Sequence, residues 1–408
     1  MDQRMALLCI KQQRRVGKIA RIHEFSIKTN VRYGFGAAKT VGQLARELGC
    51  KSALVVTDPG LVKAGLAGTI CGYLDDSGIG WTCFDKVEPN PSIETVESCY
   101  GLYQETKPDL IIGLGGGSSM DVAKAVAVLA TNGGHISDYE GYEKVRVDKR
   151  PLVAIPTTAG TGSEVTASTV ITDRKRQVKM AIISNKVKPE YALVDPELTL
   201  TIPPALTAST GMDALTHAIE SYVSKEAIPE TQALALHAIR LIGRSIRKAV
   251  LYGDDARARD DMMMGSLLAG MAFAISKLGN VHAMAHPLGG IFDVPHGFAN
   301  AIVLPYVMNF NALAAPELFT DIAQALGGNI HGLSTREAAL LAVDLVKELN
   351  HDIGIPADLK GFGVNEDALD KLCEDAMISG NIKVNPRRTT VKDIRSLYLQ
   401  AIRGTFES

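Results

Sequence analysis

The chain is poor in aromatic side chains, and its positive and negative charges nearly cancel. Aromatic residues make up only 5% of its 408 residues, and the formal net charge is −2. Nucleic acids call for a cationic surface and, when single-stranded, for rings on which bases stack, so we expect no nucleic-acid partner. No apolar run approaches the roughly 20 residues that span a bilayer, so we expect no membrane partner either. What remains is the composition of a globular enzyme with a small-molecule substrate.

Cysteine is also scarce. The six cysteines are scattered, and no two of them form a C-x-x-C pair. Buried thiols in a reducing compartment explain this distribution better than disulfides or a zinc site. We therefore expect a cytoplasmic protein.

The first 24 residues differ in composition from the rest of the chain. They contain six lysines and arginines against only Asp2 and Glu24. The apolar patch at 5–9 is too short for a secretory signal. A mobile or surface-docked extension is the simpler interpretation, and a short amphipathic targeting or encapsulation helix is the alternative.

The length of the chain suggests two domains. In the first half, apolar runs typical of strands, at 53–57, 81–84, 110–113 and 152–155, alternate with helical stretches. This alternation is typical of a parallel sheet covered on both faces. Beyond about Thr201 only helical periodicity remains, at 204–223, 230–251, 256–276 and 334–350. We predict an α/β domain over residues 25–200 and an all-α domain over 201–408, with a ligand cleft between them.

A glycine-rich segment, Gly113–Asp121, lies between a predicted strand and a predicted helix. Glycines let backbone N–H groups approach a phosphate, and a helix N-terminus adds favourable partial charge. The segment is not G-x-G-x-x-G, because Ser118 stands at the last glycine position, and a tight turn without a ligand stays an alternative. A second small-residue turn, at 156–164, follows the next strand. Two such turns at the carboxyl ends of strands favour a dinucleotide-binding crevice.

Asp58 follows an earlier predicted strand and bears on the choice of dinucleotide. A carboxylate at this place accepts hydrogen bonds from an adenosine ribose and repels a 2′-phosphate, which favours NAD over NADP. An Asx turn before Pro59 explains the residue equally well. From the sequence alone, both interpretations stay open.

Four of the nine histidines fall in two short segments of the helical half. Asp213 and His217 are spaced i and i+4, which puts them on one face of a helix. His282 and His286 share a face in the same way, and His296 follows shortly after. One carboxylate together with neutral imidazoles suits a divalent first-row ion such as Fe²⁺ or Zn²⁺.

These segments resemble the iron-containing (group III) alcohol dehydrogenase family. The two family signature regions match 192–197 with 211–220, and 279–290 with 295–297, and the likeness covers roughly Phe25 to the C-terminus. The resemblance implies a dinucleotide domain, a helical domain and a metal ion at the bottom of the cleft between them. It also implies homodimers or larger homo-oligomers. The implied metal ligands are Asp213, His217, His282 and His296, with Fe²⁺ expected and Zn²⁺ as the alternative.

Further site residues carry over from the same resemblance. His286 matches a histidine near the nicotinamide that does not bind the metal. With an ordinary pKa near 6.5 it would relay a proton or hold the ribose and substrate oxygens, and a purely structural role is the alternative. The implied substrate-pocket residues are Thr166, Ser168, Val170 and Phe273. The implied NAD contacts are Asp58, Asn90, Gly116, Gly117, Ser118, Thr157, Thr158, Thr161 and Lys179.

The expected activity is NAD-dependent interconversion of short-chain primary alcohols or diols and their aldehydes, with the metal ion as a Lewis acid on the substrate oxygen. The nearest alternative is a zinc-dependent polyol dehydrogenase, similar to glycerol dehydrogenases. A lyase similar to dehydroquinate synthase would need a cluster of Lys and Arg, which residues 166–171 do not offer. A non-catalytic NAD- or metal-binding protein is disfavoured by the intact set of ligands.

Overall fold

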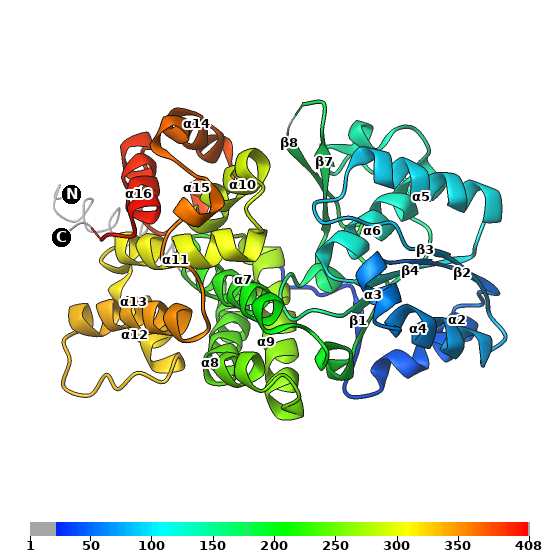
Figure 1. The fold of residues 1–408 in the computed structure, drawn as a ribbon, viewed down its shortest axis with the longest axis horizontal. Helices are drawn as coiled ribbons and strands as arrows, with labels where there is room; N and C mark the ends of the chain where they lie inside the picture. Colours follow the sequence, from blue (N-terminus) through cyan, green and yellow to red (C-terminus); the bar gives the residue numbers. More distant parts are fainter. Residues whose placement is uncertain (1–21, 177, 407–408) are drawn as a thin grey trace, which may run out of the picture.

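The computed structural model describes residues 22–176 and 178–406. Most of the basic extension at residues 1–24 lies outside these ranges, so its role stays a prediction. Figure 1 shows two halves side by side, one containing all the described strands and the other containing helices α7 to α16. The predicted fold class, a parallel α/β domain followed by a helical domain, is confirmed.

A parallel sheet of six strands forms the centre of the first half, in the order β1-β9-β6-β4-β2-β3. Its strands are β1 (Asn30–Tyr33), β2 (Ser52–Val56), β3 (Gly80–Phe84), β4 (Leu110–Gly115), β6 (Leu152–Pro156) and β9 (Tyr191–Val194). β4 is buried along its whole length, as expected of a strand with helices on both faces. The short strands β1 and β9 were not predicted from the sequence.

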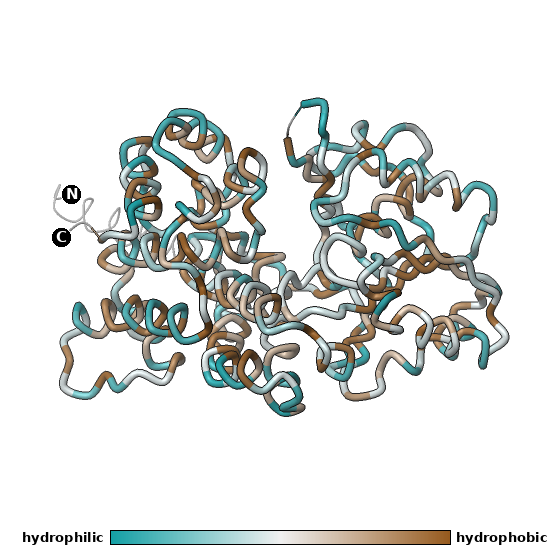
Figure 2. Tube along the Cα trace, viewed as in Figure 1, coloured by the Kyte–Doolittle hydropathy of each residue, from teal (hydrophilic) through white to brown (hydrophobic). Residues whose placement is uncertain are grey.

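Helices cover both faces of this sheet, because successive residues of a strand point to opposite sides. Leu54 and Val56 pack with α5 (Ile93–Thr106) and α6 (Gly117–Asn132). Ala53 and Val55 pack with helices on the other face, α2 (Val41–Glu47) and α4 (Leu66–Asp75). The central strands are accordingly brown in Figure 2, whereas teal segments lie toward the outside. Burial of both faces stabilises these continuous apolar strands.

The chain changes its direction of travel across the sheet after β3. β2 pairs with β3 on one side and with β4 on the other. The chain continues from β2 into α3 (Pro59–Lys63) and from β4 into α6. In open α/β sheets, ligands bind outside the carboxyl ends of the strands at such a switch point. Asp58 and the glycine-rich segment at 113–121, called the first glycine turn below, therefore both lie where the fold favours a ligand.

A second, smaller sheet joins β5 (Gly141–Tyr142), β8 (Val178–Ile183) and β7 (Ser168–Asp173), none of which was predicted. β7 and β8 pair antiparallel. A hydrogen bond from Thr172 N to Pro91 O (2.8 Å) attaches β7 to the chain just before α5. Figure 1 shows the β7–β8 hairpin on the side of the α/β half that faces the helices.

The second half consists of helices with one shared apolar core. The helices predicted from periodicity correspond to α7, α8, α9 and α13, with boundaries within two residues of those expected. The helices are α7 (Pro204–Val223), α8 (Pro229–Leu251), α9 (Ala256–Ser276), α10 (Asn280–Phe292), α11 (His296–Ala312), α12 (Pro316–Ala325), α13 (Thr335–Asp352), α14 (Leu369–Ile378), α15 (Asn381–Val384) and α16 (Val391–Arg403). Short 3-10 helices are η1 (Ala37–Thr40), η2 (Ile136–Tyr139), η3 (Ser163–Val165), η4 (Pro196–Thr199), η5 (Lys360–Phe362) and η6 (Glu366–Ala368).

The two halves approach each other closely where α9 meets the second small-residue turn. Gly162 has φ +60°, and a Cβ on it would lie 2.6 Å from the Cα of Gly270 on α9. Only glycines let the two backbones come this close. The turn at 156–164 is therefore packed directly against the helical half.

The described residues contain no single helix that is long and apolar enough to cross a membrane. The bent pair α9 and α10 meets the criterion only jointly, and only by length and composition. The five cysteines that the structure describes are free thiols: Cys50, Cys71, Cys83, Cys99 and Cys373.

Candidate metal centre and cofactor crevice

The four predicted metal ligands come together from three helices. Asp213 and His217 stand one turn apart on α7, His282 lies on α10, and His296 is the first residue of α11. The Nε2 atoms of the three histidines, in that order, lie 3.8, 3.7 and 3.7 Å from Asp213 Oδ1. The ligand atoms of Asp213, His217 and His282 are all within 4.8 Å of one another. Segments far apart in the sequence thus place one carboxylate and three imidazoles around a common centre.

The spacing of these atoms fits a divalent ion. Bonds of about 2.1 Å to a tetrahedral ion would place neighbouring ligand atoms about 3.4 Å apart. The three separations measured from Asp213 Oδ1 exceed this value by only a few tenths of an ångström. The side chain of His296 is 31% exposed, whereas those of Asp213 and His282 are buried. The centre is therefore closed on one side and reaches solvent on the other, as a catalytic metal site requires.

Two polar contacts behind the imidazoles determine which ring nitrogen faces the centre. Glu220, seven residues after Asp213 on α7, accepts a hydrogen bond from His282 Nδ1 (2.6 Å). The carbonyl oxygen of Gly160 lies 3.3 Å from His217 Nδ1. Each contact favours a proton on Nδ1 and leaves Nε2 free to bind an ion. Neither partner was predicted, although the i+7 spacing of Glu220 from Asp213 on one helix face was an available signal.

Asn300 of α11 also lies among the ligands and was not predicted. Its Nδ2 donates to Asp213 Oδ1 (2.7 Å) and lies 3.1 Å from the Nε2 atoms of His282 and His296. Its Oδ1 is buried and has no partner among the described residues. The amide therefore donates a hydrogen bond to Asp213 Oδ1, an atom that would bind an ion. Its i+4 spacing from His296 was the sequence signal for this position.

Burial and neighbouring charges set the protonation of the centre. Burial lowers the pKa of His217 to about 4 and that of His296 to about 3, so both rings are neutral near pH 7. Burial would also lower the pKa of His282, but Asp213 and Glu220 together raise it to about 9. The proton on His282 thus partly balances two buried carboxylates. A divalent cation can take over that role, with release of the proton.

The first glycine turn forms the N-terminus of α6. Gly115 has φ +145°, and a Cβ on it would lie 2.6 Å from Ser119 Oγ, so this position requires glycine. α6 begins at Gly117 with no side-chain cap from Gly116 and no acidic residue in its first turn. The unpaired N–H groups and the positive end of the helix dipole suit a pyrophosphate.

The second turn lies directly against the first. A Cβ on Gly116 would be 3.4 Å from Thr158 Oγ1, and one on Gly117 would be 3.0 Å from Thr161 Cγ2. Thr158 Oγ1 is buried without a hydrogen-bond partner in the described part of the chain. An unpartnered hydroxyl beside an uncapped helix N-terminus is suited to a polar ligand. The two turns bring together six of the predicted cofactor residues: Gly116, Gly117, Ser118, Thr157, Thr158 and Thr161.

Asp58 combines features of both interpretations offered for it. Its Oδ1 accepts a hydrogen bond from Leu61 N (3.1 Å) and caps α3. Its Oδ2 lies 3.4 Å from the position of a Cβ on Gly115. One oxygen is thus used by the fold, while the other lies next to the first glycine turn.

Asn90 and Lys179 lie near two of the histidines, His286 and His296. Lys179 Nζ donates to Asn90 Oδ1 (2.9 Å), and the ammonium charge contributes to lowering the pKa of His286 and of His296. The His286 ring is exposed and stacks on that of His296 with centroids 5.5 Å apart. Although this ring reaches solvent, desolvation by surrounding groups lowers its pKa well below the usual value. The expectation of an ordinary pKa near 6.5 for His286 was therefore wrong.

Three of the four predicted pocket residues have accessible surface, and one of them, Phe273, contacts a residue of the metal centre. The ring of Phe273 stacks on that of His217 with centroids 4.4 Å apart, and Ser168 and Val170 are half-buried on β7. Thr166 is buried, and its hydroxyl accepts a hydrogen bond from Lys124 Nζ (3.1 Å). The hydroxyl of Thr166 is therefore already hydrogen-bonded within the protein and is not exposed to a substrate.

A buried group of charges beside this pocket was not predicted. Lys124 of α6 donates to Ser163 Oγ (2.8 Å) and to the carbonyl oxygen of Ser168 (2.8 Å). Burial raises the pKa of Asp121 to about 6 and that of Glu164 to about 7, and it lowers the pKa of Lys124 to about 8. These side chains tie the helix of the first glycine turn to the second turn and to β7.

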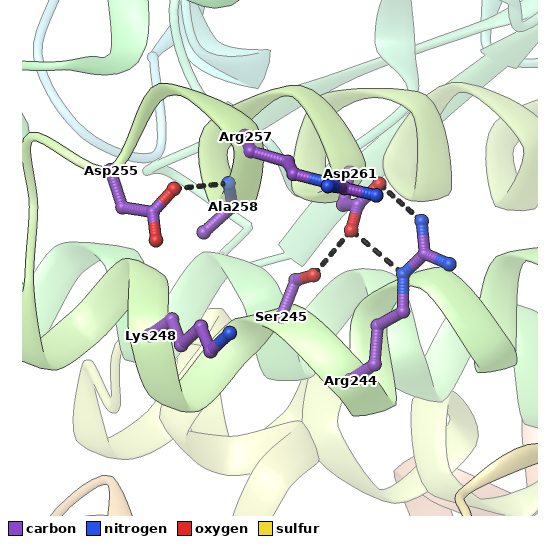
Figure 3. A pocket seen from close by; sticks show the side chains of 7 residues that line it. All are labelled: Arg244, Ser245, Lys248, Asp255, Arg257, Ala258 and Asp261. Atoms are coloured by element: carbon purple, nitrogen blue, oxygen red, sulfur yellow. Dashed lines mark hydrogen bonds and ion pairs between the residues drawn. The ribbon is translucent and has the colours of Figure 1, made fainter.

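A surface hollow of about 220 Å³ between α8 and α9 is separate from this site. Figure 3 shows that Arg244 and Ser245 of α8 both contact Asp261 of α9 there. The predicted site residues do not line it. Its paired charges are explained as a structural contact between the two helices.

Comparison with known proteins identifies the same family from both halves of the chain. The model of the iron-containing alcohol dehydrogenases matches residues 28–196, and the model of the C-terminal part of the Fe-containing alcohol dehydrogenase family matches residues 207–402. The chain belongs to the iron-containing alcohol dehydrogenase family, which confirms the resemblance found in the signature segments. It is an oxidoreductase that acts on CH–OH groups.

Similar proteins match over nearly their full lengths. The 1,3-propanediol dehydrogenase of Citrobacter freundii is 45% identical over 371 residues, which cover 90% of this chain and 96% of the relative. A crystal structure of a 1,3-propanediol oxidoreductase has a TM-score of 0.92 at 44% identity and covers 94% of this chain and 100% of its own. A sulfoacetaldehyde reductase of Bifidobacterium kashiwanohense, solved in complex with NAD⁺, has a TM-score of 0.85 at 32% identity, covering 94% of this chain and 99% of its own.

Proposed function

We propose that this protein is an NAD-dependent, metal-dependent dehydrogenase that interconverts short-chain primary alcohols or diols and their aldehydes. The observation that carries the proposal is the convergence of one carboxylate and three imidazoles beside two adjoining glycine turns. A relative named for 1,3-propanediol supports a short diol as substrate. A relative solved with NAD⁺ supports NAD as the dinucleotide.

Four residues would hold the metal ion: Asp213, His217, His282 and His296. Their mixed oxygen and nitrogen donors suit Fe²⁺, with Zn²⁺ as the alternative. When bound, the ion supplies a Lewis acid that polarises the substrate oxygen and makes an alcohol hydroxyl more acidic. Glu220 and the Gly160 carbonyl orient the rings of His282 and His217, so the Nε2 atoms of both rings would face the ion.

The α/β half would hold the dinucleotide in three places: after β2, after β4, and at the pair Asn90 and Lys179. The N-terminus of α6 would face the pyrophosphate, and Asp58 would contact the adenosine ribose. Asn90 and Lys179 lie closest to the histidines, so they would contact the nicotinamide end. The nicotinamide must lie near the ion's substrate, because hydride passes directly between the two.

His286 is the side chain proposed to receive or hold the substrate proton. Its exposed ring stacks on that of His296, and its low pKa keeps it neutral, with one ring nitrogen able to accept a hydrogen bond. Phe273 covers the His217 ring and keeps water from that side. Together these two side chains would shape the space where a short substrate meets the centre.

A substrate and metal panel tests the proposal. Protein freed of metal and reloaded with Fe²⁺ or Zn²⁺ is assayed at the NADH absorbance band with ethanol, propanol, 1,2- and 1,3-propanediol, glycerol and the matching aldehydes, using NAD(H) and NADP(H). We expect turnover with NAD(H) and a short alcohol or diol only in loaded protein, and its loss in His217→Ala and His282→Ala, which should still bind NADH. Normal turnover without metal would refute the proposal.

The same panel separates the nearest alternative. A zinc-dependent polyol dehydrogenase would prefer glycerol and Zn²⁺ over 1,3-propanediol and Fe²⁺. The lyase alternative is weakened by family membership. It is not revived by Lys124, whose three hydrogen bonds are made within the protein. We keep residue 200 as the proposed boundary between the two domains and homo-oligomers as the proposed assembly.

A further inference from the structure

A short polar chain crosses from the α/β half to the helical half beside the cofactor crevice. Lys179 Nζ donates to Asn90 Oδ1 (2.9 Å), and Asn90 Nδ2 donates to Asp293 Oδ1 (3.3 Å). Lys179 is on β8, and Asn90 lies between β3 and α5. Asp293 ends α10, three residues before His296. The chain of contacts thus links two proposed NAD-binding side chains to the segment between two metal-binding helices.

The charges at the two ends fix the orientation of the Asn90 amide. Its oxygen faces the ammonium group of Lys179, and its nitrogen faces the carboxylate of Asp293. The reversed amide would bring two donors together at one end and two acceptors together at the other. Removing the carboxylate therefore removes one of the two interactions that distinguish the orientations.

The backbone on both sides is suited to holding these side chains still. Asn90 has φ +52° between Pro89 and Pro91, and its carbonyl oxygen accepts a hydrogen bond from Thr172 Oγ1 (3.1 Å). Asp293 has φ +54°, as the left-handed C-cap of α10. Asn and Asp tolerate this conformation better than most residues, and both segments are anchored in regular structure.

Lys179 has little freedom of its own. A Cβ placed on Gly289 of α10 would lie 3.2 Å from its Nζ, so the ammonium group sits against that helix. Asn90 is the only hydrogen-bond partner of Lys179 Nζ within the described residues. Asp293 also contributes a favourable electrostatic interaction with the ammonium group. The position of the cation therefore depends on the amide, and the amide depends on Asp293.

We propose that Asp293 is a positioning residue that holds Asn90, and through it Lys179, ready for the nicotinamide–ribose half of the dinucleotide. The inference rests on the proposed function, in which Asn90 and Lys179 contact NAD. Without the carboxylate, both side chains would have to be ordered when the dinucleotide binds, and this loss of preorganisation weakens binding by roughly tenfold. Metal binding should be unaffected, because Asp293 does not reach the ligands.

Asp293→Gly is the informative variant, because glycine adopts φ near +54° without strain and removes only the side chain. Lys107→Gly is a matched control, since Lys107 is the left-handed C-cap of α5 (φ +47°). Asp293→Asn should restore part of the affinity, because its amide oxygen still accepts from Asn90 Nδ2. NADH and ADP are titrated separately into metal-loaded protein by calorimetry, and metal content is measured in each variant.

We expect Asp293→Gly to bind NADH about tenfold more weakly and to raise KM for NAD, with ADP affinity and metal content unchanged. ADP serves as a probe because it lacks the nicotinamide riboside. Unchanged NADH affinity would overturn the inference, as would equal losses for ADP and NADH, or a loss of metal. If the wild-type protein itself bound no NADH, the proposed function would fail first, and this inference would fail with it.

Discussion

Glu220→Gln is the substitution that tests most directly how the metal centre is built. Glu220 lies behind the centre and contacts no substrate space. Its Oε2 accepts from His282 Nδ1 (2.6 Å) and its Oε1 from Val281 N (2.6 Å). Glutamine has the same shape but offers one acceptor and one donor, so it cannot accept both hydrogen bonds. Either the imidazole loses its partner or a buried backbone N–H does.

The expected loss can be estimated from two independent effects. Removing a partner behind a metal-binding histidine typically lowers metal affinity by about 10- to 100-fold. Leaving a buried donor unpaired costs about 1–3 kcal/mol, and the contacts here are short and charge-assisted. We therefore expect the upper end of the range, an affinity about 100-fold lower, equivalent to about 2.7 kcal/mol. Thermal stabilisation by a fixed metal concentration should shrink by a similar amount.

The measurement is a titration of metal-free protein with Zn²⁺ against a chelating dye, repeated with Fe²⁺ under anaerobic conditions. Glu190→Gln is the matched control, because Glu190 likewise accepts from a side-chain nitrogen, Lys149 Nζ (2.6 Å), and from a backbone N–H, that of Leu152 (2.8 Å), far from the centre. Wild-type metal affinity in Glu220→Gln would refute the reasoning. An equal loss in Glu190→Gln would show that the effect is general destabilisation.

Three further predictions concern the cofactor and the buried charges. Asp58→Gly should improve the use of NADP(H) relative to NAD(H), measured as the ratio of the two kcat/KM values. The free energy of unfolding should fall by only a few tenths of a kcal/mol, because glycine is a tolerable N-cap. An unchanged ratio would mean that Asp58 serves only as the N-cap of α3. Asn300→Ala should lower Tm more in metal-free than in metal-loaded protein, because only without an ion does Asp213 depend on the amide donor; equal losses would contradict this. Burial raises the pKa of Glu164 from 4.5 to about 7. Between these two pH values the folded state keeps a proton that the unfolded state loses, so the free energy of unfolding falls by roughly 2–3 kcal/mol as pH rises through this range. Glu164→Gln should lack this fall. Urea unfolding at pH 5 and at pH 8 should therefore show that the variant gains stability relative to the wild type at the higher pH. The same stability difference at both pH values would refute the assignment.

The sequence predicted those parts of the fold that have a strong local pattern. The strands β2, β3, β4 and β6 are apolar runs followed by turn residues, and long helices such as α7 and α9 show clear periodicity. The edge strand β1 has only four residues, and the hairpin strands β7 and β8 alternate buried residues with partly exposed ones, so their apolar pattern is weak. Nothing local marks their pairing, because sheet contacts are made between distant segments.

In the candidate site, too, features within one helix could be predicted from the sequence, whereas contacts between elements could not. The pairs Asp213/His217 on α7 and His282/His286 on α10 could be predicted from i, i+4 spacing, since that spacing is a property of one helix. Helix spacing could place Glu220 and Asn300 on the same helix faces as Asp213 and His296. It could not give their roles or that of the Gly160 carbonyl, because each acts across a contact between elements. The pKa of His286 was misjudged for a related reason: besides desolvation, charged groups on other elements, such as Lys179 on β8, lower it.

The contact between the two halves at the proposed metal centre affects how binding of the ion and binding of the dinucleotide influence each other. All four proposed metal ligands come from the helical half, whereas His217 Nδ1 contacts the carbonyl oxygen of Gly160, which belongs to the second turn of the α/β half. That same turn contains Thr158 and Thr161, which are proposed to contact the dinucleotide. Ordering the turn for one ligand therefore prepares it for the other. Because such coupling is reciprocal, any gain in NADH affinity caused by the ion must equal the gain in ion affinity caused by NADH.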